Sequence, residues 1–398
     1  MTFEPYRRVL AIPGVRALML VGLVARIPVT ATGLTLTLHV VNNLKLGFFQ
    51  AGLVGAAATV GVAVGAPVAG WLVDRHGLRP VVAITTVAQV AFWVSAPFLP
   101  YWLLLGGAVL GGVLALPVMS VVRQCVAAAV PAEQRRTGFA LDSMLVEVAY
   151  MIGPALAVAS ATAFGSGWTM AAVGMGLVGS GVAMLMLNPP TRTEDDEAPG
   201  TAVPRRQWLT PALLSLLGIT FAATFVLIAT ELSLVAVLKA DNAARWSGLA
   251  IGLWCFCSLV GGFVYGALPR GFSPLVMVGA MAALTVPVGL AGSWQLLCMA
   301  MIPAGILCAP ALSTTVDTVS QWVPAGARGE AMGLHSTALT LGLAVSAPIT
   351  GSIIDTYGTL WSFAIAGLAG LLLVILAIPF WRRAPQPARS VVPEPAAA

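Results

Sequence analysis

The stretch GVLALPVMSVVRQCVAAAVPAEQRRTGFALDS at residues 112–143 recurs without gaps as GILCAPALSTTVDTVSQWVPAGARGEAMGLHS at residues 305–336. The two copies share glycine, leucine, proline, serine, valine and arginine at equal spacing. An internal match with one copy in each half of the chain indicates two related structural units. The alternative is a coincidence of composition between Gly- and Ala-rich segments.

The composition around this repeat is that of a membrane protein. Of the 398 residues, 59% are hydrophobic and 9% are charged, whereas about a quarter of a soluble domain is charged. Residues 80–122, 148–191 and 271–316 contain no charged side chain. Each of these runs is long enough for two helical spans of about 20 residues, and their continuous hydrophobicity excludes a β-barrel.

The fold class predicted from these runs is an all-α membrane protein with twelve transmembrane helices in two pseudo-symmetric six-helix bundles. The predicted bundles are residues 1–188 and 208–383. The Pro-rich, charged stretch 189–207 is predicted to be a cytoplasmic linker, and 384–398 a disordered cytoplasmic tail. The predicted spans are 15–40, 48–73, 80–99, 102–128, 137–162, 167–188, 208–238, 245–268, 273–292, 295–321, 329–354 and 359–381.

Basic residues predict the orientation. Fifteen arginines fall in segments on one side of the predicted spans, and only Lys45, Lys239 and Arg245 fall on the other. Because positive residues stay on the cytoplasmic side, both termini are expected in the cytoplasm. We expect no cleaved signal at the start of the chain, and 18 arginines against two lysines are typical of a GC-rich bacterial genome. The expected location is therefore the bacterial inner membrane.

A second repeat concerns the order of the helices. GVAVGAPVAGWLVDRHG (61–77) matches GLAVSAPITGSIIDTYG (342–358), although the first copy is predicted to end inside and the second outside. Inverted three-helix units nested within the two halves would produce this pattern.

The loop after the second span reads GWLVDRHGLRP (70–80). It resembles the G-x-L-x-D-R-x-G-R-K/R signature of the major facilitator superfamily, in its twelve-helix form. The matching residues are Gly70, Leu72, Asp74, Arg75, Gly77 and Arg79, and Leu78 departs where a basic residue is usual. The resemblance implies a gating loop in which Asp74 meets the N-terminus of helix eleven, where the helix dipole favours a carboxylate. The alternative for Asp74 and Arg75 is that they are solvated loop charges.

Helix five carries Gly153-Pro154. This pair is similar to the centre of the G-x-x-x-G-P-x-x-G-G signature of proton-coupled exporters, such as those for drugs or small metabolites, although the flanking glycines are missing. A Gly-Pro kink in an ordinary packed helix is the alternative.

Ionisable residues inside membrane spans are costly and are therefore candidate functional groups. We expect Arg123 and Asp317 to face each other across the floor of a cavity, with Tyr150 on its wall. A structural pair between Arg26 and Glu147 is the alternative, and His39 and His335 are expected near the membrane interfaces. The candidate cavity residues, of which the carboxylates are candidate proton carriers, are Arg26, Arg123, Glu147, Tyr150, Glu231 and Asp317.

No G-x-x-x-x-G-K-[ST] loop, catalytic motif or metal-ligand spacing is present, so we expect no ATPase, enzyme, cofactor or metal. The leading interpretation is a monomeric secondary transporter in the lipid bilayer that exports a small molecule in exchange for protons and binds no nucleic acid. The alternatives are a proton-coupled uptake permease for a polar metabolite and, from another class, a transporter-like sensor or lipid-handling protein.

Overall fold

The structure is a computed structural model that describes residues 3–192, 203–243, 246–268 and 271–381. All regular secondary structure within these ranges is helical. In the same ranges, eleven segments are long and apolar enough to cross a membrane, and the helical segment Pro274–Leu290, at the position of the predicted ninth span, is apolar but shorter. Each predicted span therefore coincides with an apolar helical segment.

The first half of the chain supplies six spans, of which the fourth is made of two helices. Tight turns at Gly77 and Gly165, whose φ angles are +82° and +86°, join two of the helix pairs. Glycine adopts this left-handed conformation without strain, so the helices can reverse direction with no longer loop. The helices are α2 (Val15–Asn42), α3 (Phe48–His76), α4 (Leu78–Ser95), α5 (Tyr101–Val113), α6 (Val118–Ala129), α7 (Arg135–Phe164) and α8 (Ser166–Leu187).

The second half repeats this order. Its helices are α10 (Pro211–Ala240), α11 (Ser247–Ala267), α12 (Pro274–Thr285), α13 (Trp294–Trp322), α14 (Arg328–Tyr357) and α15 (Thr359–Trp381). Two short helices that the hydropathy pattern does not predict are α1 (Glu4–Ala11) and α9 (Arg205–Trp208). In the described ranges, short 3-10 turns include Ala96–Phe98, Val286–Leu290 and Ala325–Ala327.

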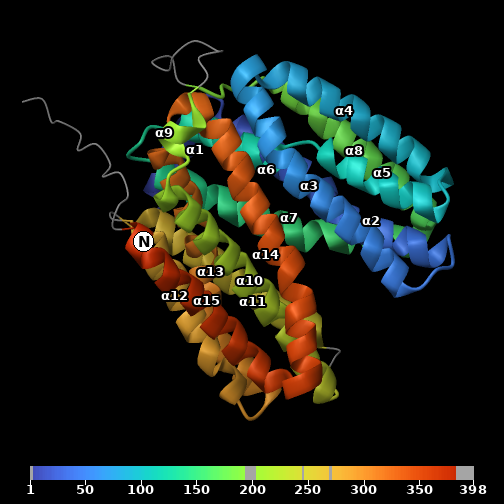
Figure 1. Ribbon diagram of the computed structural model, residues 1–398, viewed down its shortest axis with the longest axis vertical. Coiled ribbons are helices and arrows are strands. Elements are labelled where there is room, and N and C mark those ends of the chain that lie inside the picture. The colour runs from blue at the N-terminus through green and yellow to red at the C-terminus, as the bar shows by residue number, and fades with distance from the viewer. Residues whose placement is uncertain (1–2, 193–202, 244–245, 269–270, 382–398) are drawn as a thin grey trace, which may run out of the picture.

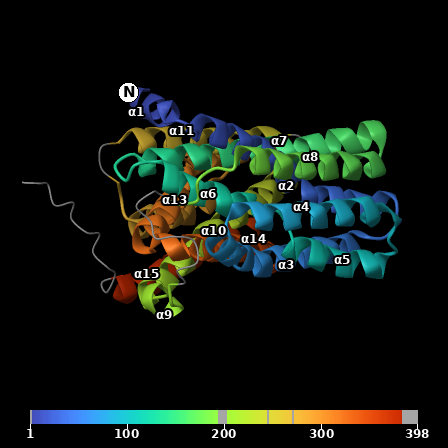
Figure 2. The same ribbon diagram turned by 90° about the horizontal axis from the view of Figure 1, so that it is seen from above.

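The helices form two bundles that approach each other at one end and diverge toward the other (Figure 1). The approaching end, where α1, α6 and α9 lie (Figure 1, Figure 2), is called the closed end below. Apolar side chains from both halves share one buried cluster there, which includes Val122 and Val126 of α6 with Val319 and Met332 of α13 and α14. This common core holds the halves together at the closed end.

The predicted linker is only partly described, and the predicted tail is not described. Residues 193–202 of the linker and the whole tail 384–398 lie outside the described residues. The described ends of the linker contact the closed end: Arg192 donates to the main-chain oxygen of Asp74, and the Arg205 guanidinium pairs with Glu330 at 2.6 Å.

Candidate functional site

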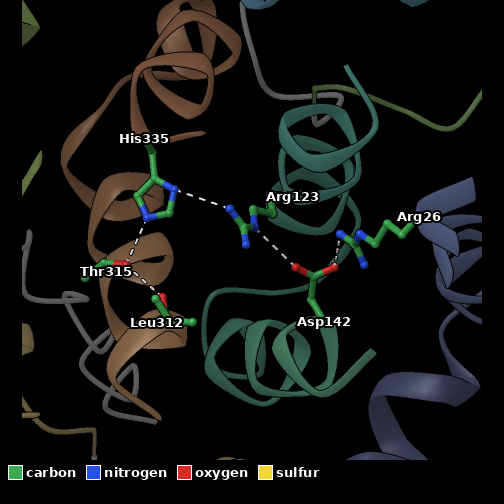
Figure 3. Close-up of polar contacts among 6 residues, drawn as sticks. All are labelled: Arg26, Arg123, Asp142, Leu312, Thr315 and His335. Atoms are coloured by element: carbon green, nitrogen blue, oxygen red, sulfur yellow. Dashed lines mark hydrogen bonds and ion pairs between the residues drawn. The ribbon is translucent and has the colours of Figure 1, made fainter. Parts of the chain in front are cut away.

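A chain of buried polar side chains crosses the molecule between the halves (Figure 3). Asp142 of α7 accepts from Arg26 Nη2 of α2 at 2.6 Å through Oδ1, and from Arg123 Nε of α6 at 3.4 Å through Oδ2. Arg26, Arg123 and Asp142 are 0%, 3% and 1% exposed. Two guanidinium groups thus share one carboxylate in the protein interior, which leaves one positive charge in excess.

The same chain reaches the second half through His335 of α14. Arg123 Nη1 lies 3.4 Å from His335 Nδ1, and His335 Nε2 lies 2.9 Å from the hydroxyl of Thr315 on α13. Since Thr315 donates its only hydroxyl proton to the Leu312 carbonyl at 2.7 Å, it must accept from His335 Nε2. Nδ1 of neutral His335 is then free to accept from Arg123, so the contact joins the halves through a defined tautomer.

These contacts correct several expectations. Arg123 does not face Asp317, and Arg26 does not pair with Glu147, because Asp142 occupies both guanidinium groups. His335 is fully buried in this network, and His39, in the last turn of α2, is 1% exposed, so both rings lie inside the protein, and their depth in the membrane stays a prediction. Asp142, which shares the predicted fifth span with Glu147, is not among the candidate cavity residues above, although it is an ionisable residue inside that span.

Asp317 lies apart from the network, near the end of α13. Gln321 donates to its Oδ2 at 3.0 Å, and no ion pair to Asp317 occurs among the described residues. Arg135 and Arg136 are close enough to interact with it electrostatically. Its position at the closed end explains why it cannot meet Arg123, which points toward Asp142 and His335.

Glu147 forms a second link between the halves. From α7 of the first half, its Oε1 accepts from Ser258 Oγ of α11 at 3.0 Å and from Cys308 Sγ of α13 at 3.7 Å. Ser258 itself accepts from the Ala309 N–H at 3.1 Å, which fixes its hydroxyl for donation. A carboxylate of one half is therefore held by donors that belong to the other half.

Tyr150 and Glu231 lie on the side toward which the bundles diverge. Tyr150 follows Glu147 by one helical turn, and its side chain is 48% exposed. Charged residues of both halves, among them Arg123 and Glu231, are close enough to act on its phenol group. Glu231 of α10 makes no hydrogen bond or ion pair to any described residue, and the Glu147 carboxylate is close enough to act on it electrostatically.

Asp74 forms the main polar contact at the closed end. Its Oδ1 accepts from the Gly329 N–H at 3.0 Å, and its Oδ2 from the Glu330 N–H at 2.9 Å, at the first turn of α14. Gln124 of α6 donates to Oδ1 at 2.8 Å. Free N–H groups and a positive dipole end make a helix N-terminus a good partner for a carboxylate. The contact expected between Asp74 and the N-terminus of the eleventh span, which is α14, is thus present.

The other residues of this loop motif shape the same contact. A Cβ atom on Gly70 would lie 2.1 Å from the Gly329 carbonyl oxygen, so only glycine permits this approach of α3 to α14. Gly77 makes the turn, and Arg75 stacks over Trp71 at 5.4 Å. Arg79 is exposed, and Leu78, where the signature has a basic residue, is buried.

The Gly153-Pro154 pair belongs to the contact between α7 and α2. A Cβ atom on Gly153 would lie 2.1 Å from Thr30 Oγ1 and 2.6 Å from the Ile27 carbonyl oxygen. Thr30 donates to the Ala149 carbonyl at 2.9 Å, which fastens the two helices next to Pro154. The pair therefore serves close helix packing within the first half.

No group of three or more His, Cys, Asp or Glu side chains in the described ranges could hold a metal ion. The five cysteines are free thiols, and four of them are buried. The polar contacts described above join the two bundles at several depths. They must break if the bundles separate at the closed end.

Comparisons with known proteins agree with this architecture. The family model of the Major Facilitator Superfamily matches residues 18–291 and 247–397. Among curated proteins no match is found.

Similar solved structures include the human organic anion transporter MFSD10, with a TM-score of 0.74 and 17% identity over 93% of this chain and 99% of that one. A bacterial homologue of the iron transporter ferroportin in an outward-facing state has a TM-score of 0.72 and 16% identity, over 93% of this chain and 98% of that one. The proton:xylose symporter XylE has a TM-score of 0.70 and 14% identity, over 92% of this chain and 96% of that one. At these identities the likeness concerns the fold, and the family model carries the assignment: the chain belongs to the Major Facilitator Superfamily of membrane transporters.

Proposed function

We propose that this transporter exports a small molecule across the bacterial inner membrane in exchange for protons, by alternating access. In this proposal the closed end faces the cytoplasm, because the helix ends that meet there carry most of the arginines, including Arg75, Arg136 and Arg205. The conformation described above is then open to the outside. The transport cycle consists of opening the closed end while the diverging ends come together.

The observation that carries the proton coupling is the position of Glu147. An ionised carboxylate is a strong acceptor for the Ser258 and Cys308 donors, and it loses acceptor strength when it is protonated. Because these donors belong to the second half, a proton on Glu147 weakens a contact between the halves. Proton binding from the outer side thus favours the opening of the closed end.

Two other carboxylates are candidates for the same role. Glu231 has no hydrogen-bonding partner among the described residues and is close enough to Glu147 for their charges to repel each other. Two like charges in a low-dielectric space favour the uptake of one proton by the pair. Asp317 is a weaker candidate, because it lies near the closed end with Gln321 as its partner.

The test is transport in proteoliposomes of defined orientation with an imposed pH gradient. Glu147→Gln should abolish the dependence of transport on the gradient, since glutamine cannot take up a proton. Glu133→Gln, a change at an exposed loop residue, is the matched control and should transport normally. Retention of proton-driven transport by the Glu147→Gln, Glu231→Gln and Asp317→Asn variants would sink the coupling proposal. Net accumulation in right-side-out vesicles, in place of everted ones, would identify an uptake permease.

A further inference from the structure

The fourth span is interrupted in the middle of the membrane. The hydropathy pattern predicts one helix over 102–128, but α5 ends at Val113 and α6 begins at Val118. The four residues between them, 114–117, are not helical, and they end with Pro117. An interruption at this depth leaves main-chain groups that must be satisfied within the protein.

Proline alone does not explain this break. The internal repeat places Pro310 in α13 at the position equivalent to Pro117, and α13 runs without interruption over Trp294–Trp322. In both halves the carbonyl four residues before the proline lacks its helical N–H partner and lies against a glycine. The Val113 oxygen is 2.1 Å from a Cβ built on Gly65, and the Ile306 oxygen is 1.7 Å from one built on Gly261.

What distinguishes the first half is Gln89 of α4, which is 4% exposed. Its Nε2 donates to the Gly111 carbonyl at 2.9 Å and to the Leu114 carbonyl at 3.1 Å, and its Oε1 accepts from Trp93 Nε1 at 3.1 Å. In a continuous helix those two carbonyls would accept from the N–H groups of residues 115 and 118. Instead the Ala115 N–H donates to Gly112 and the Val118 N–H to Leu116.

The corresponding helix of the second half offers no such donor. The α12 sequence PLVMVGAMAALT contains no amide side chain. The chain thus contains its own comparison: two related helices with equivalent prolines, of which only the one beside a buried glutamine is broken.

The break determines the position of α6, a helix of 12 residues that makes one polar contact with the second half and supports another through Asp74. Arg123 joins Asp142 to His335, and its neighbour Gln124 donates to Asp74 at the closed end. Because the two residues are adjacent, a rotation or shift of α6 moves both contacts together.

We infer that Gln89 is a positioning residue for transport. It keeps residues 114–117 of the fourth span out of the helical conformation and thereby fixes the position of α6, with Arg123 and Gln124, against the second half. This role rests on the proposed alternating-access function, but the break itself is a property of the resting protein. Loss of the carboxamide lets the Gly111 and Leu114 carbonyls recapture the N–H groups of Ala115 and Val118, and α6 turns with them.

Hydrogen exchange of the full-length protein in nanodiscs, without substrate or gradient, tests the break directly. Gln89→Leu should change exchange over residues 111–129 and leave the equivalent residues 304–322 unchanged. Thr85→Val removes a buried hydroxyl that bonds only within α4 and should leave both regions unchanged. Unchanged exchange over 111–129 in Gln89→Leu would overturn the inference, whatever transport shows.

A double variant separates positioning from stability. Gln89→Leu should lower the melting temperature, because buried hydrogen bonds are lost, and it should lower transport several-fold, because α6 is no longer held in place. Adding Pro117→Ala supplies an N–H for the Val113 carbonyl and favours a continuous helix. The double variant should regain the melting temperature but not transport. Recovery of both would show that Gln89 acts only on stability, and would overturn the positioning role without touching the proposed function.

Discussion

At the scale of single residues, Asp142 is the centre of the buried network. It compensates part of the charge of Arg26 and Arg123, neither of which reaches solvent. Removing one partner of a buried ion pair leaves an uncompensated charge in a low-dielectric interior. This costs far more free energy than replacing the whole pair by apolar side chains. The carboxylate is therefore expected to matter for stability before it matters for transport.

Asp142→Asn should destabilise the protein by about 3–5 kcal/mol, because it leaves two guanidinium groups buried without a counter-charge. Thermal unfolding in detergent measures this effect. Asp317→Asn is the control, since Asp317 makes no ion pair to a described residue, and its melting temperature should change little. Equal losses in the two variants would contradict the role assigned to Asp142.

At the scale of elements, the closed end depends on how near α3 comes to α14. Gly70→Ala should force the two helices apart, because the added methyl group would meet the Gly329 carbonyl oxygen at 2.1 Å. The closed end should then open more often. Labelling of Ser336→Cys by an impermeant maleimide from the cytoplasmic side, in a background without native cysteines, should become several-fold faster.

Gly55→Ala, on the same helix, is the matched control for this change. No atom of a described neighbouring residue lies within 4 Å of the Cβ position of Gly55, so the labelling rate should stay at that of the parent. Acceleration of labelling by both alanine variants would show that helix propensity, and not the close approach, controls the closed end.

The short helix α1 of the first half packs against α11 of the second half through Tyr6. Tyr6 stacks on Phe263 of α11 at 4.9 Å, and its hydroxyl donates to the main-chain oxygens of Gly262 and Phe263 at 3.1 and 2.5 Å. Gly14, with φ of +81°, forms the turn between α1 and α2. Burial raises the pKa of Tyr6, so its hydroxyl remains a donor throughout the neutral range.

Tyr6→Ala should release α1 and increase tryptic cleavage at Arg7 and Arg8 several-fold. The parent should show the same increase as the pH rises above about 10, the usual pKa of tyrosine, because the raised pKa makes ionisation favour the undocked helix. Tyr101→Phe is the control, since the Tyr101 hydroxyl bonds only to Gln50 within the first half. Cleavage that is equal in all variants would contradict docking through Tyr6.

At the scale of the whole molecule, the two bundles share one apolar core at the closed end and diverge elsewhere (Figure 1). Tyr150→Cys should accordingly react with an impermeant maleimide from the periplasmic side and not from the cytoplasmic side. Ser143→Cys, two turns earlier on α7 and 5% exposed in the parent, should be protected from both sides. Faster labelling of Tyr150→Cys from the cytoplasmic side would show that the resting state is open inward.

Much of this architecture follows from the sequence. Charge-free apolar runs of this length are typical of membrane spans, and the match between residues 112–143 and 305–336 indicates two related halves. Hydropathy and internal repeats depend on the local sequence or on the membrane itself, so they can be recognised without knowledge of the packing. The Asp74 contact spans 255 residues of sequence, and it was expected only because residues 70–80 resemble the family signature.

The pairing of the buried charges depended on the tertiary structure. Arg123 meets His335 across 212 residues of sequence, and Glu147 meets Cys308 across 161. Spacing cannot predict such contacts, since they depend on how each helix is rotated about its axis. The break at residues 114–117 likewise required Gln89 of a different helix. The sequence determined that two bundles would form in a membrane, and tertiary packing decided which charges would join them.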